Sequence, residues 1–329
     1  MAEGSSEVSM QAIGGYFELE LRKGEHYHRN AICLNTARNC FEYVLRTRNL
    51  KKVYIPYYTC EVMLEPIKKL GIKYEFYSIN AALEPIDQPV LKENEAYLYT
   101  NYFGLKQGWV KRLAQVYGNQ LMVDNAQAFY AEPQQGIDTF YSVRKFFGVS
   151  DGAYLYTETW LEQKLEQDVS FNRMIHLLKR IDLGAEEGYQ DFRINDDSLC
   201  EQDIKTMSRL TEAVVYGVDY ETAKRKRREN YAFMDKALKD SNRIHLRLDD
   251  DAVPMVYPYL TDDETLRQRL IENKVFVATY WPNVKEWVTK EMLEYDLTER
   301  LLPIPVDQRY GIEEMKTIIS IIKGNVSGY

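Results

Sequence analysis

Apolar positions recur with two different periods along residues 30–160, and the two periods alternate. Some segments place apolar side chains three or four residues apart, the spacing of one face of a helix, and a capping pair Asn35–Thr36 precedes the first of them. The segments between them are short apolar runs bounded by glycine, proline or polar residues, which is typical of strands. We expect helices at 35–50, 60–71 and 108–118, and strands at 51–58, 72–79, 95–104, 120–124, 137–143 and 152–158.

This alternation predicts an α/β protein, a three-layer α/β/α sandwich around a mixed, largely parallel sheet. The helices between strands supply the crossovers that parallel pairing requires. From residue 158 to 240 the pattern is long, charged and helical, and it then returns to mixed structure that includes an expected strand at 275–281. We expect a large α/β domain over 1–215 and a smaller C-terminal α+β domain over 216–329, with the N-terminal segment a candidate to pack on the smaller one.

Charge and cysteine content narrow the class of protein. The 329 residues carry a formal net charge of −8, with a pI near 5.3, which argues against a general binder of nucleic acid or anionic membranes. The basic run Lys224–Arg228 is flanked by acids in a helical pattern, and we interpret it as a solvated helix face. The four cysteines are scattered, so we expect neither a disulfide framework nor a metal site. We find no leader pattern and no span-length apolar stretch, and we expect a cytoplasmic protein.

Lys145 has apolar and aromatic residues on both sides in the sequence, and it is the first candidate catalytic residue. Lys145 follows the predicted strand at 137–143 and precedes a glycine-containing turn. A pyridoxal phosphate enzyme needs such an amine to form a Schiff base, and it needs a carboxylate that keeps the pyridine nitrogen protonated. Asp124 ends an apolar strand and can supply that carboxylate, while Gln127, three residues on, can reach the 3-oxygen of the ring.

The start of the first predicted helix is a candidate phosphate site. Thr36 and Ala37 open this helix, and free N–H groups at a helix N-terminus bind anions. Ser142, three residues before Lys145, adds a hydroxyl. Taken singly these signals are weak, because a threonine here is usually only a cap and an aspartate at a strand end usually forms a turn. Their order, and the tendency of ligands to bind beyond the carboxyl ends of parallel strands, favour one pyridoxal phosphate site.

Longer segments resemble a known family. They are LNTARNCFEYVL, YIPYYTCEVMLEPIKKLGIKYEFY, LYTNYFG, MVDNAQAF, YSVRKFFGVSDGAYLY, MSRLTEAV, RKRRENY and LLPIPVDQRYGIEEMKTII. From about Gly14 to Lys323, the chain resembles the DegT/DnrJ/StrS-type sugar aminotransferases, which have the aspartate-aminotransferase-like fold type I. The resemblance makes Lys145 the Schiff-base lysine and Asp124 the partner of the pyridine nitrogen. It assigns the ring oxygen to Gln127, and the phosphate to Thr36, Ala37 and Ser142.

The resemblance also implies an activity. Family members are homodimers that move an amino group, usually from glutamate, to the keto group of a nucleotide-linked sugar for polysaccharide or lipopolysaccharide synthesis. This chain departs from the family at Phe140, where a serine is usual, and at Cys60, where an aromatic side chain usually stacks on the ring. Tyr58 lies on the same face of an extended segment and is expected to stack instead. The asparagine-rich loop that a partner subunit contributes is not evident in residues 188–204.

The acceptor is the least specified part of this interpretation. Specificity is expected from Tyr102, Tyr280 and Trp281, although most of the 26 tyrosines are expected to serve packing. Lys145 argues against the related dehydratases, which carry histidine at that position. Two alternatives stay open: a pyridoxal phosphate enzyme acting on a non-sugar ketone or an amino acid, and a non-catalytic homologue kept as a scaffold.

Overall fold

A seven-stranded sheet lies at the centre of the computed structural model, which describes residues 13–324. Its spatial order is β1-β7-β6-β5-β4-β2-β3, and β7 alone runs antiparallel to its neighbours. The strands are β1 (Ile32–Leu34), β2 (Lys52–Pro56), β3 (Lys73–Tyr77), β4 (Glu95–Thr100), β5 (Leu121–Asn125), β6 (Asp138–Ser142) and β7 (Ala153–Tyr156). The prediction of a three-layer sandwich with a mixed, largely parallel sheet is confirmed.

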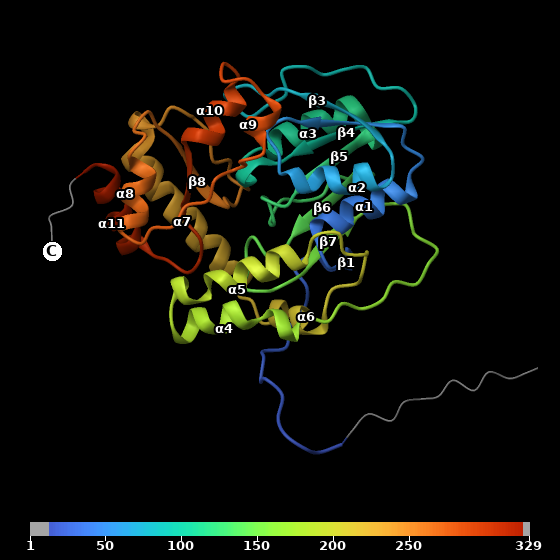
Figure 1. Cartoon of the computed structure of the whole chain (residues 1–329), viewed down its shortest axis with the longest axis horizontal. Helices are drawn as coiled ribbons and strands as arrows, with labels where there is room; N and C mark the ends of the chain where they lie inside the picture. Colours follow the sequence, from blue (N-terminus) through green and yellow to red (C-terminus); the bar gives the residue numbers. More distant parts are fainter. Residues whose placement is uncertain (1–12, 325–329) are drawn as a thin grey trace, which may run out of the picture.

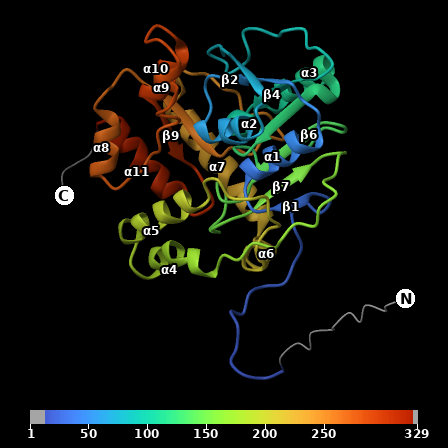
Figure 2. The same ribbon diagram turned by 45° about the vertical axis from the view of Figure 1, so that its right-hand side comes forward.

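Alternate strand residues face two separate layers of helices. One face packs on α1 (Ala37–Thr47) and α2 (Leu64–Lys69) and buries side chains such as Leu98 and Met122. The other face packs on α3 (Gln107–Tyr117) and the C-terminal helices. Figures 1 and 2 show α1 and α2 together over the sheet. Successive side chains of a strand point to opposite faces of the sheet. Because helices bury both faces here, apolar residues occupy consecutive positions, and the strands are continuous apolar runs in the sequence.

The C-terminal part is helical around a two-stranded antiparallel sheet, and it lies beside the main sheet (Figure 1). Its elements are α6 (Arg209–Tyr216), α7 (Tyr220–Leu238), β8 (Val256–Leu260), α8 (Leu266–Glu272), α9 (Val284–Trp287), α10 (Leu293–Arg300), β9 (Leu301–Pro305) and α11 (Ile312–Ile322). One continuous apolar core joins this part to the α3 face of the main sheet. The predicted boundary at 215 falls at the end of α6.

Two further regions complete the chain. The hairpin α4 (Ile175–Asp182) and α5 (Ala185–Ser198) lies below the C-terminal part, at the lower left of Figure 2. Single 3₁₀ turns lie at Glu61–Met63, Tyr102–Gly104, Gly118–Gln120, Phe171–Arg173 and Lys239–Ser241. The N-terminal segment contacts both the main sheet and the C-terminal part, because His26 bonds the Tyr154 hydroxyl of β7 while Tyr27 packs on Tyr220 of α7. Within residues 13–324, no helix is both long and apolar enough to cross a membrane.

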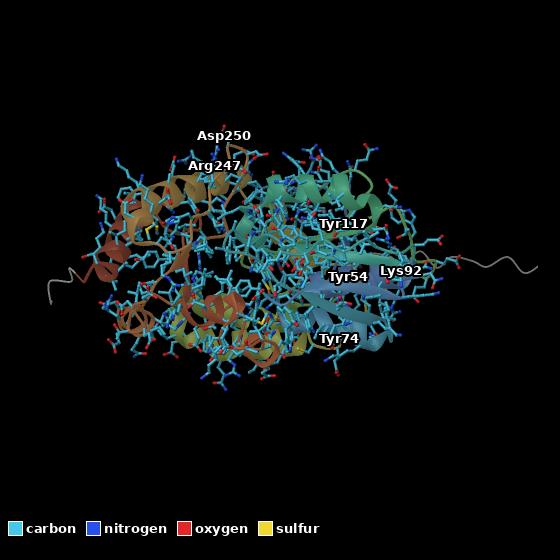
Figure 3. All side chains as sticks on the ribbon, turned by 90° about the horizontal axis from the view of Figure 1, so that it is seen from above. Tyr54, Tyr74, Lys92, Tyr117, Arg247 and Asp250 are labelled. Carbon is cyan, nitrogen blue, oxygen red and sulfur yellow. The ribbon has the colours of Figure 1, made fainter. Side chains whose placement is uncertain are left out.

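Two expectations from the sequence differ from the structure. Residues 275–281 form no strand, since the Arg267 guanidinium occupies the carbonyls of Val277 and Ala278 that a neighbouring strand would need. The run Lys224–Arg228 is only partly a solvated face, because Arg227 is fully buried. The tyrosines mostly pack: the Tyr97 ring stacks on those of Tyr54, Tyr77 and Tyr117 on the α3 face. Figure 3 labels Tyr54 and Tyr117 of this group.

Candidate functional site

The carboxyl ends of six strands lie at one edge of the sheet. β2, β3, β4, β5 and β6 are parallel, and β1 runs the same way because β1 and β6 both pair antiparallel with β7. The register places Thr100 beside Asp124 and Asp124 beside Phe140. On the next strands, Ser142 and Leu34 both pair with Ala153. The predicted residues at and just after these strand ends therefore belong to one edge.

The N-terminus of α1 joins this edge through backbone hydrogen bonds. Gly152 N–H donates to the Asn35 carbonyl at 2.6 Å, and Val143 N–H donates to the Gly152 carbonyl at 3.0 Å. The Thr36 hydroxyl accepts from Asn39 N–H at 3.0 Å. The N–H groups of Ala37 and the residue after it precede the first helical hydrogen bond, so they are free to bind an anion. Thr36 is thus a cap, and the helix end beside it fits a phosphate.

Lys145 and Asp124 are the two charged groups of the site, and the charge of Lys145 acts on the Asp124 carboxyl without an ion pair between them. Asp124 is 6% exposed and accepts a hydrogen bond from Ala126 N–H at 2.8 Å. Burial raises the pKa of its carboxyl, and the positive charge of Lys145 together with that hydrogen bond opposes the rise. Lys145 lies exposed on the turn after β6. It makes no side-chain hydrogen bond or ion pair within residues 13–324, so its amine is free to react.

Gln127 carries an unused hydrogen-bond donor. Its side chain is 1% exposed, and its Oε1 accepts from Phe103 N–H at 3.0 Å, which fixes the amide. Its Nε2 is buried without a partner among the described residues. A buried donor left unpaired costs free energy, so a ligand acceptor such as the oxygen of a pyridine ring fits here.

Phe140 and Ser142 explain one departure from the family pattern. Phe140 is 1% exposed and packs on Phe41 of α1, with ring centroids 5.8 Å apart. It belongs to the apolar core under that helix. Ser142 lies two residues further along the same face of β6, at the edge itself.

The aromatic residues predicted for the site form one cluster. Tyr58 is fully buried, its ring lies 5.1 Å from that of Trp281, and its carbonyl accepts from the Tyr102 hydroxyl at 2.8 Å. Tyr280 lies 5.3 Å from Trp281, and burial raises its pKa to about 12. The structure thus brings together all three predicted substrate residues with Tyr58. Burial raises the pKa of the half-buried Cys60 thiol, and the positive charge of Lys145 opposes part of this rise.

Two supporting residues were missed in the sequence. Asp151 is fully buried, accepts from the N–H and hydroxyl of Ser208 at 2.8 and 2.7 Å and from the Thr211 hydroxyl, and so locks the turn after Lys145 to α6. The sequence shows Ser208 as the N-cap of a helix, but it does not show that a distant carboxylate binds this serine. The role of Asp151 therefore becomes visible only in the structure. Arg227 is the second residue; its helical spacing with Ala223 and Asn230 places it on the buried face of α7.

Solved structures share this architecture over most of the chain. The sugar aminotransferase CalS13 from Micromonospora echinospora aligns with a TM-score of 0.61 at 16% identity, over 90% of this chain and 87% of that one. A DegT DnrJ EryC1 StrS aminotransferase from Brucella abortus gives 0.61 at 14% identity, over 91% and 86%. The PLP form of Spr1654 from Streptococcus pneumoniae, described as a sugar aminotransferase, gives 0.61 at 15% identity, over 90% and 88%.

This chain has the fold of the sugar aminotransferases. No family model and no curated sequence matches it. At 14–16% identity the similarity concerns the fold, and the chemistry is argued from the site.

Proposed function

We propose that this protein is a pyridoxal phosphate-dependent aminotransferase. The observation that carries the proposal is the meeting of an unpaired Lys145, a buried Asp124 and the open N-terminus of α1 at one sheet edge. The unpaired Nε2 of Gln127 adds a fourth group of the kind the cofactor needs. Spr1654, with the same fold, has been determined in PLP and PMP forms, which supports the choice of cofactor.

Each residue has a distinct task in this proposal. The cofactor supplies an aldehyde and a ring that accepts electrons. Lys145 Nζ would hold the cofactor aldehyde, and its amine is placed to move a proton as general base and acid. Asp124 keeps a proton on the ring nitrogen, and its burial strengthens that interaction. The free N–H groups of Ala37 and the residue after it, with the Ser142 hydroxyl, would bind the phosphate, while Thr36 caps the helix beside them through Asn39.

We propose glutamate as the amino donor and a nucleotide-linked keto sugar as the acceptor, in cytoplasmic synthesis of surface-polysaccharide or lipopolysaccharide sugars. Tyr102, Tyr280 and Trp281 would line the acceptor side, with Tyr58 as the aromatic neighbour of the ring. The sugar aminotransferases of the same fold support this acceptor class.

We further propose that the protein works as a homodimer. The α4–α5 hairpin and the loop before it expose a row of large apolar side chains that a monomer would leave in water. A second copy would cover them and restrict solvent at the exposed Lys145. These side chains are Phe171, Ile175, Leu178, Ile181, Leu183, Tyr189, Phe192 and Ile194.

The decisive experiment is trapping the cofactor on its lysine. The purified protein is titrated with pyridoxal phosphate, reduced with borohydride and digested, and the modified peptide is located by mass spectrometry. We expect modification at Lys145, lost in Lys145→Ala and kept in Lys111→Ala, a control that alters an exposed lysine on α3. An unmodified Lys145 at saturating cofactor would refute the proposal. Mixing the pyridoxamine phosphate form with keto-sugar nucleotides and α-keto acids then identifies the acceptor.

A further inference from the structure

A buried arginine contacts the turn that carries Lys145. Arg227 of α7 is 1% exposed, and its guanidinium lies 4.6 Å from the centroid of the Phe146 ring. Its Nη2 donates to the Phe146 carbonyl at 3.5 Å, and its Nη1 donates to the carbonyls of Pro254 and Met255 at 3.2 and 3.0 Å. Phe146 directly follows Lys145, so a helix of the C-terminal part reaches the backbone beside the reactive amine.

Gln308 completes the contact from a second element. Its Oε1 accepts from Arg227 Nε at 2.8 Å, while its Nε2 donates to the Phe146 carbonyl at 2.8 Å. One carbonyl therefore receives two donors that are themselves bonded to each other. Such a closed set of hydrogen bonds fixes the orientation of the Phe146–Phe147 peptide, the second peptide after Lys145, more firmly than one bond would.

The same arginine also reaches the opposite side of the site. Met255, whose carbonyl binds Arg227, donates its N–H to the Phe103 carbonyl at 2.9 Å. Phe103 N–H in turn donates to Gln127 Oε1 at 3.0 Å. Arg227 is thus the branch point of two hydrogen-bonded paths, one to the Lys145 turn and one to the Gln127 amide.

This arrangement is costly for stability alone. Within residues 13–324, Arg227 has no carboxylate ion-pair partner, because the nearby Asp307 is paired with Arg309 at 2.7 and 2.8 Å. Burial lowers the pKa of its guanidinium to about 10. Burying a charge that only neutral acceptors bind costs desolvation free energy, and an apolar side chain of similar volume would fill the space at a lower cost in folding free energy. A role in placing the Lys145 turn accounts for its presence.

We propose that Arg227 and Gln308 are positioning residues for Lys145, holding its turn so that Nζ faces the cofactor aldehyde. The inference rests on the proposed function. The affected step is the condensation of the Lys145 amine with the aldehyde, in which a C=N bond forms and water is released. Neither residue touches the reacting atoms.

The test separates covalent capture from binding of the cofactor. Gln308→Glu keeps an acceptor for Arg227, and gains an ion pair with it, but removes the donor to the Phe146 carbonyl. Pyridoxal phosphate needs Lys145 for its covalent bond, whereas pyridoxamine phosphate binds without it. We expect the rate of bond formation with pyridoxal phosphate to fall roughly 10-fold, with the dissociation constant for pyridoxamine phosphate changed less than about twofold.

Controls make each outcome decisive. Arg228→Gln alters a neighbouring arginine that binds the carbonyls of Asp249 and Ala252, not Phe146, and should leave both measurements unchanged. Gln308→Met, which removes both hydrogen bonds at similar volume, should reproduce the selective effect if Gln308→Glu does not fold. Equal losses for both cofactors, or no loss, would overturn the positioning role. Absence of the covalent bond in the unsubstituted protein would instead overturn the proposed function and this inference with it.

Discussion

Gly104 lies where the loop after β4 touches both the C-terminal part and the Gln127 loop. Its φ is +74°, a left-handed conformation that costs an L residue about 1–2 kcal/mol. A Cβ added there would lie 2.6 Å from the Val253 carbonyl oxygen and 3.3 Å from that of Gln127. Both are backbone atoms and neither can rotate away, so one chain must shift, at a typical further cost of about 1–3 kcal/mol.

We therefore expect Gly104→Ala to lower the free energy of unfolding by about 2–5 kcal/mol. Gly71→Ala is the matched control, because Gly71 has φ +65° and no atom within 4 Å of an added Cβ, and it should cost only the conformational 1–2 kcal/mol or so. Urea denaturation followed by tyrosine and tryptophan fluorescence measures both. Gly104→Ala should also weaken pyridoxamine phosphate binding by displacing Gln127. Equal losses of stability in the two variants would show that the close approach does not constrain the loop.

Three more predictions concern buried polar groups. Asp151→Asn should lower the free energy of unfolding by about 3 kcal/mol in a denaturant titration, since an amide cannot accept from all the donors on α6, whereas the exposed Asp182→Asn should have little effect. Burial lowers the pKa of His28 to about 4, so its contribution to the free energy of unfolding is complete above pH 6.5 and is lost as the pH falls toward 4. Denaturant titrations at several pH values should show a loss of up to about 3 kcal/mol in the unsubstituted protein and a smaller loss in His28→Gln. The same pH profile in both proteins would contradict this prediction. Asp124→Asn should slow single-turnover amino transfer roughly 100-fold while the melting temperature stays near that of the unsubstituted protein; equal rates would remove Asp124 from the site.

Much of the fold could be predicted from periodicity. The strands over 51–143 are flanked by helices and lie in the parallel part of the sheet, so local pattern and tertiary structure agree. β1 escaped notice because three residues carry too little pattern, and its pairing with β7 is set by the fold. Residues 275–281 alternate like a strand, but Arg267 takes their carbonyls, which no local pattern reveals.

The site divides in the same way. The meeting of Thr36, Asp124 and Lys145 at one edge follows from parallel strands, so the positions of strand ends sufficed to group them. The roles of the two hydroxyl candidates depended on side-chain direction: Thr36 caps its own helix, and Ser142 rather than Phe140 reaches the edge. Arg227 was assigned to the surface because its charge outweighed its helical position. Only the acceptor carbonyls around it, supplied by distant segments, explain how that charge is tolerated.

The apolar core shared by the main sheet and the C-terminal helices bears on how the chain can be divided. Residues from α3, β4, α7, β8 and α11 belong to the same buried cluster. A fragment ending near residue 215 would leave one wall of that cluster in water, so neither half is expected to fold by itself. The two halves should instead melt in a single cooperative transition. Natural insertions or fusions are then tolerated best at exposed loop positions such as 88 and 90.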